Sequence, residues 1–132
     1  RRVLFRSDLY DIDGPFRVDG PAGAIEFIPF LVNHGSIDAL GFRIDDTAYL
    51  PDVSHIPAAA WAQLQGIELW IVDALRRTPH PSHTHLAQTL YWITTLAPRR
   101  AVITNMHLDM DYDTLCAELP QGVIPAYDGL VL

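Results

Sequence analysis

Two short motifs each end an apolar, strand-forming run with one side chain that can bind a metal ion. VNHG at Val32–Gly35 presents His34, and YLPDVS at Tyr49–Ser54 presents Asp52. A third candidate ligand, His107, lies in the motif ITNMH. Because these side chains are far apart in the sequence, they can meet only when a whole fold brings several strand ends together, unlike the ligands of a local zinc finger. The combination indicates a metal-centred hydrolase.

Each of these assignments has a simpler alternative. A lone histidine at a strand end is more often a structural or surface residue than a ligand, and Pro51-Asp52 is common turn chemistry. Two observations favour a ligand at His34: Gly35 lets the backbone turn sharply, and the apolar FIPFLV before the motif anchors the strand. An anionic oxygen donor at a strand end, as at Asp52, suits a position that bridges two metal ions.

The stretch RRTPHPSHTH (Arg76–His85) brings three histidines together between a buried strand and a helix. The helix is expected to begin near Thr84, and the unpaired amides at a helix start form a natural seat for phosphate. A histidine there can donate a hydrogen bond to a phosphoryl oxygen or protonate a leaving alkoxide. The alternative is a polar loop with solvated histidines, which we prefer for His80. The preceding strand ends at Asp73, which either orients a ligand histidine or is a structural strand-end aspartate.

The elements that must position these residues are strands in succession, followed by strands that alternate with helices. Strands are predicted at 16–18, 24–33, 39–44, 47–50, 67–72, 101–104, 123–124 and 130–132. Helices are predicted at 57–65, 84–96 and 112–119, the first with Pro57 at its tolerated first position. This order is typical of a layered α/β domain, and it fits half of an αββα sandwich.

The composition excludes several classes of protein. The 132 residues carry a formal net charge of −7, and an acidic surface repels the backbone of DNA and RNA, which argues against a general nucleic-acid binder. The apolar runs are too short to span a bilayer. The single Cys116 cannot form an internal disulfide, which agrees with a cytoplasmic location. Its setting between Leu115 and Leu119 predicts a small core residue.

Taken in order, the motifs VNHG, YLPD and TNMH, with a His-rich loop and the terminal AYDGLVL, resemble the C-terminal half of a metallo-β-lactamase-fold hydrolase. The resemblance covers residues 25–132 and implies the C-terminal part of an αββα metallo-β-lactamase sandwich. That superfamily also carries an upstream His-x-His-x-Asp-His cluster, whereas His34 is the first histidine here. We therefore expect an N-terminally truncated protein with a partial hydrolase domain at 8–132. Residues 1–7 can be back-translated as a common sequencing-adaptor sequence, and we expect them to be a library artefact.

The resemblance also implies a dinuclear site, with two divalent metal ions, zinc or manganese, in the full-length protein. His34, Asp52 and His107 would be metal ligands, and a hydroxide that bridges the ions would attack phosphorus or an acyl carbon. Many relatives read Leu-Thr-His-x-Ser at the third motif. This chain instead has Asn105 directly after Thr104, and His107 follows two residues later. In an extended segment, residues two apart share one face, so His107 can still turn inward.

The His-Pro-Ser-His run at 80–83 resembles the His-Pro-Thr-His of the phosphoribosyl cyclic phosphate phosphodiesterase-like (PhnP-like) branch. This match makes His83 the substrate-side catalytic histidine, with His85 as the second candidate. The leading hypothesis is a phosphodiesterase whose partner is a small cyclic or nucleotide-like phosphate ester, without a membrane partner. The alternatives are another hydrolase of this fold, acting on a lactone, a thioester or a tRNA 3′ end, and a catalytically silent fragment or binding module. The sequence leaves a homodimer open.

Overall fold

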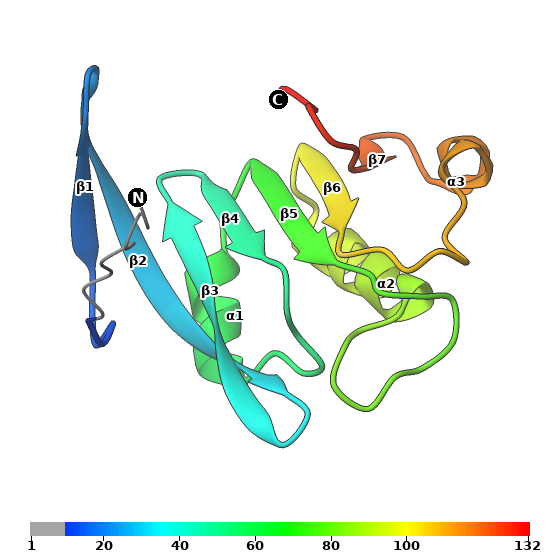
Figure 1. Ribbon diagram of the computed structural model, residues 1–132, viewed down its shortest axis with the longest axis horizontal. Coiled ribbons are helices and arrows are strands. Elements are labelled where there is room, and N and C mark those ends of the chain that lie inside the picture. Colours follow the sequence, from blue (N-terminus) through cyan, green and yellow to red (C-terminus); the bar gives the residue numbers. More distant parts are fainter. Residues whose placement is uncertain (1–9) are drawn as a thin grey trace, which may run out of the picture.

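A computed structural model describes residues 10–132, so the adaptor-like segment 1–7 lies outside the described residues. The described residues form one seven-stranded sheet whose strands follow the order of the sequence (Figure 1). The strands are β1 (Phe16–Gly20), β2 (Gly23–His34), β3 (Ile37–Ile44), β4 (Thr47–Leu50), β5 (Leu69–Asp73), β6 (Arg100–Thr104) and β7 (Val123–Pro125). The helices are α1 (Ala58–Leu64), α2 (Leu86–Leu96) and α3 (Tyr112–Glu118).

The strand pairing changes from antiparallel to parallel in the middle of the sheet. β1 to β4 are antiparallel neighbours, and β4 to β7 are parallel neighbours. Antiparallel strands need only short turns, and here the turns contain Gly35 at φ 67° and Asp45 at φ 54°. Parallel strands need longer crossovers, which α1, α2 and α3 provide. As a result, β2, β4, β5 and β6 all end at the same edge of the sheet.

The core lies between the sheet and the helices α1 and α2, which Figure 1 shows behind the strands. Successive side chains of a strand point to opposite faces, so every second residue faces the helices. The buried residues of this face are Phe30, Val32, Ala48, Leu50, Trp70, Val72, Ala101 and Ile103. Packing is tight at Gly41, where a Cβ would collide with the ring of Phe30 and lie 2.9 Å from Leu50 Cδ1.

The opposite face of the sheet keeps apolar side chains exposed. Leu31 on β2 is 60% exposed and Tyr49 on β4 is 41% exposed. Both residues alternate with buried neighbours, so they point away from α1 and α2. Within residues 10–132, no helix combines the length and apolar character that crossing a membrane would require.

The predicted α/β order is confirmed, with corrections at three places. Residues 130–132 are not a strand, so β7 is the last strand of the described chain. Helix α2 begins at Leu86 rather than at Thr84, because the backbone of His85 is still extended, with φ −120° and ψ 162°, and forms a β-bridge with Arg76. The prediction of a core position for Cys116 is wrong, since its side chain is exposed. Only Leu115 of the short helix α3 is buried, and the next residue points about 100° around the helix from it.

Candidate metal centre

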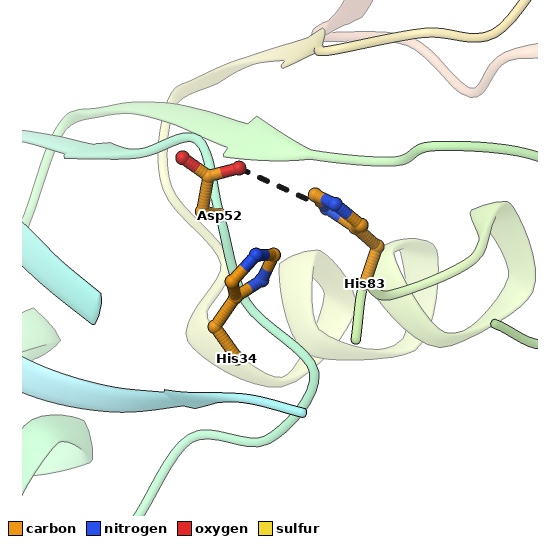
Figure 2. Close-up of side chains that lie close together, drawn as sticks. All are labelled: His34, Asp52 and His83. Carbon is orange, nitrogen blue, oxygen red and sulfur yellow. Dashed lines mark ion pairs between the residues drawn. The ribbon is translucent and has the colours of Figure 1, made fainter. Parts of the chain in front are cut away.

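Three side chains converge at the edge where β2, β4 and β5 end (Figure 2). His34 is the last residue of β2, Asp52 lies just beyond β4, and His83 lies in the loop between β5 and α2. Each offers one ligand atom, and these atoms all lie within 4.8 Å of one another. The motifs predict the meeting of His34 and Asp52, and the structure adds His83 to them. We call these three residues the ligand group.

The turn after β2 allows the His83 loop to approach the sheet edge. Gly35 has φ 67°, and its N–H donates to Ser54 Oγ at 3.0 Å. A Cβ on Gly35 would lie only 2.8 Å from the Cβ of Ser82. A side chain at this position would therefore push away the loop that carries His83. The glycine of VNHG is needed both for the turn and for this close approach.

His34 carries a buried polar atom that the described protein leaves unpaired. Its Nδ1 has no hydrogen-bond partner within residues 10–132, and its ring packs edge-on against that of His83, with 4.5 Å between ring centroids. Buried polar side-chain atoms normally have a partner, so an unpaired imidazole nitrogen on a residue of the ligand group points to a ligand that is not part of the chain. Two imidazoles and one carboxylate suit zinc or manganese. The residues present therefore fit a divalent metal ion.

Asp73, the last residue of β5, anchors His83 from the side of the core. Its carboxyl group is fully buried, and Oδ2 lies 2.8 Å from His83 Nδ1. Desolvation by burial raises the pKa of Asp73 to about 6, although the hydrogen bond and charge of His83 oppose this rise. Thr89 on α2 donates to the Asp73 carbonyl oxygen at 2.7 Å. The contact with His83 is the one that a histidine-orienting carboxylate requires.

Asn105 also reaches the ligand group, although the sequence motifs did not single it out as a site residue. Its Nδ2 lies 3.2 Å from the carbonyl oxygen of Pro51 and 3.5 Å from Asp52 Oδ1. The signal for it in the sequence is its place directly after Thr104, where the resemblance leads us to expect a histidine.

The remaining candidates lie outside the ligand group. The ring of His107 is 54% exposed, and its Nδ1 lies 3.1 Å from Asp109 Oδ1. Asn105 has φ 58°, so the segment is not extended there, and residues 105 and 107 do not share one face. The structure therefore does not bring His107 to the group, and its role as a ligand stays a prediction. His85 precedes α2 without a side-chain capping bond, and His80 Nδ1 lies 3.3 Å from the backbone N of Ser82.

Comparisons with known proteins identify the fold. The sequence model of the family described as Beta-lactamase superfamily domain matches residues 5–106. A crystal structure described as a new diphosphatase from the PhnP family is similar, with a TM-score of 0.83 and 32% identity, over 91% of this chain and 46% of that chain. Zinc-bound PqqB from Methylobacterium extorquens shares the fold, with a TM-score of 0.66 and 14% identity, over 90% of this chain and 53% of that chain.

A curated relative, an octanoyltransferase from Porphyromonas gingivalis (strain ATCC BAA-308 / W83), is 29% identical over 121 residues, covering 89% of this chain and 24% of that protein. The chain thus spans about half the length of the two crystal structures and about a quarter of the octanoyltransferase. The matches confirm the predicted α/β metallo-β-lactamase fold and the resemblance to the PhnP-like branch. Because the family model covers more than half of the chain, the protein belongs to the beta-lactamase superfamily domain family.

Proposed function

We propose that the protein is a metal-dependent hydrolase and that its substrate is a small cyclic or nucleotide-like phosphodiester. The observation that carries this proposal is the ligand group of His34, Asp52 and His83, together with the buried and unpaired Nδ1 of His34. The likeness to a PhnP-family diphosphatase supports a phosphate ester as the substrate. The formal net charge of −7 supports a small substrate rather than a nucleic acid.

His34 and Asp52 would hold a zinc or manganese ion, and a second ion would complete a dinuclear site. A bound ion of this kind lowers the pKa of water and offsets the negative charge that develops on the phosphoryl oxygens. The chain itself contributes donors that are already in place. His34 is fixed by the end of β2, and Asp52 by the corner after β4. Donors held in this way need no rearrangement when the reaction occurs.

His83 would supply the proton that the leaving oxygen needs. Its Nδ1 lies 2.8 Å from Asp73 Oδ2, so Nδ1–H is donated to that carboxylate and Nε2 remains for the substrate. A positioned acid typically contributes ~10²–10⁴-fold to a step of this kind. Asp73 would stabilise the ring while both ring nitrogens carry a proton, as in other histidine–carboxylate pairs.

The test compares His83→Ala with the wild type on two phosphodiesters in the presence of manganese or zinc. With an alkyl leaving group, which departs as an alkoxide, we expect kcat to fall by ~10²–10⁴-fold. With p-nitrophenolate, which needs little protonation, the loss should be much smaller. His55→Ala, an exposed histidine outside the ligand group, is the matched control. Because the crystal-structure relatives are longer, the assay covers this chain and any longer product of its gene.

The other outcomes of this assay separate the alternatives. Equal losses on both substrates would make His83 a binding or structural residue, and a loss of bound metal would make it a ligand. Turnover of a lactone or a thioester in place of phosphodiesters would favour another hydrolase of the same fold. Metal binding without turnover of any ester would favour a binding module.

A further inference from the structure

Asn105 has an unusual backbone conformation at the edge where the ligand group forms. It directly follows β6, and its φ of 58° lies in the left-handed region. Residues with a Cβ seldom adopt this region, but asparagine tolerates it better than most. The conformation ends the extended strand and leaves the side-chain amide among Pro51, Asp52, Asp73 and His83.

The Asn105 amide is a hydrogen-bond donor surrounded by oxygen acceptors. Its Nδ2 lies 3.2 Å from the Pro51 carbonyl oxygen, 3.4 Å from Asp73 Oδ1 and 3.5 Å from Asp52 Oδ1. The two N–H groups of the amide thus face three oxygens. This decides between the two flipped positions of the amide, because in the other position its Oδ1 would face two carboxylates. Within residues 10–132, no other group donates a hydrogen bond to the carboxylate of Asp52.

His83 lies between two carboxylates that compete for one proton. Its Nδ1 is 2.8 Å from Asp73 Oδ2 and 3.9 Å from Asp52 Oδ1. The dashed line in Figure 2 joins His83 and Asp52. The same nitrogen lies 3.3 Å from Asn105 Nδ2. A ring nitrogen that donates its proton to Asp73 cannot also accept one from Asn105. The N–H groups of the amide therefore donate to oxygens. One of these oxygens is Asp52 Oδ1, which would otherwise be open to the Nδ1–H of His83.

We propose that Asn105 is a positioning residue that determines which carboxylate receives the proton of His83. By donating to Asp52 Oδ1, it leaves His83 Nδ1–H to Asp73 and keeps the Asp52 carboxylate available to a metal ion. Without the amide, the His83 ring would divide between the two carboxylates, and part of the Asp52 population would be engaged by His83. The effect on metal binding rests on the proposed function, whereas the choice of carboxylate does not.

The substitution that isolates the amide is Asn105→Gly. Glycine adopts a positive φ without steric penalty, so this variant removes the side chain and leaves the backbone unstrained. Asp45→Gly is the matched control, because Asp45 is also an exposed polar residue with a positive φ, 54°, and it lies in the turn before β4, at the other end of that strand. Both variants change the backbone in the same way, so a difference between them reports the loss of the Asn105 side chain.

The first measurement is the long-range ¹H–¹⁵N spectrum of the histidine rings in the metal-free protein. We expect the wild type and Asp45→Gly to show one set of His83 signals with the proton on Nδ1. Asn105→Gly should show a second set, or exchange-broadened signals, for His83. A purely structural role of Asn105 would not change the signals of this one histidine while the others stay in place.

The second measurement is a titration of the same three proteins with zinc or manganese. Residues that orient metal ligands typically change metal affinity by ~10–100-fold, and we expect a weakening of this size in Asn105→Gly alone. Unchanged His83 signals together with an affinity equal to that of the control would overturn the proposal. If the wild type binds neither metal while Asn105→Gly still alters the His83 signals, the proposed function fails and the positioning role stands.

Discussion

Replacing Asp73 with asparagine is expected to stabilise the metal-free protein at neutral pH and to weaken its binding of metal. The carboxyl group is fully buried, and its desolvation raises its pKa from 3.8 to about 6. Asparagine has almost the same shape but no charge to desolvate. The variant therefore separates the free energy lost by burying a carboxylate from the role of that carboxylate in holding His83.

The pH dependence follows from the direction of this pKa change. A carboxyl group whose pKa is higher in the folded chain binds its proton more tightly there. The stability that this bound proton gives to the folded chain is therefore complete below pH 3.8, and it is lost as the pH rises through about 6. At about 1.4 kcal/mol per pKa unit, the rise from 3.8 to about 6 corresponds to a free energy on the order of 3 kcal/mol. Because asparagine does not titrate, Asp73→Asn should gain this amount over the wild type between about pH 4 and pH 7.

The assay is urea unfolding of the metal-free wild type, Asp73→Asn and the control Asp19→Asn over this pH range. Asp19 is an exposed carboxylate on β1, so its replacement should leave the pH profile almost unchanged. A constant difference between Asp73→Asn and the wild type across the range would refute the reasoning from burial. Titration with zinc or manganese should show ~10–100-fold weaker binding by Asp73→Asn, because His83 without its carboxylate partner would donate to the ligand Asp52 and compete with the metal ion for it.

Three further substitutions test the site and the core. His34→Ala should remove most of the zinc or manganese binding measured by calorimetry, because it removes one of two imidazoles in the ligand group; retained binding would exclude His34 as a ligand. His107→Ala should bind metal as the wild type does, since its ring is 54% exposed and outside the group; a loss equal to that of His34→Ala would restore it as a ligand. Gly41→Ala should lower the free energy of unfolding by about 1–3 kcal/mol, because its Cβ would meet Phe30 and Leu50. An unchanged urea midpoint would show that this packing relaxes freely.

Side chains at the ends of regular strands are predictable from the sequence, because the apolar pattern of a strand stops where such a residue begins. His34 ends the long run of β2, and Asp52 follows the short run of β4. The strands run in the same direction, so both residues lie at one edge of the sheet. The same alternation of apolar strands and helices predicts the α/β order of the described chain.

Side chains on loops are harder to place, because tertiary contacts without a local pattern decide which of them turn inward. The sequence match selects His83 from the His-rich loop, but its position beside His34 depends on the close packing of Ser82 against Gly35. The expectation for His107 assumed an extended segment after β6. The left-handed conformation of Asn105 ends that segment, so the amide reaches the ligand group and His107 does not.

The metal centre is tested most directly by anomalous X-ray scattering from crystals of the protein grown with zinc or manganese. We predict a metal peak about 2.0–2.2 Å from a nitrogen of His34 and an oxygen of Asp52, bordered by the ring of His83. A peak between His107 and Asp109, or no peak beside His34, would contradict the assignment of the site.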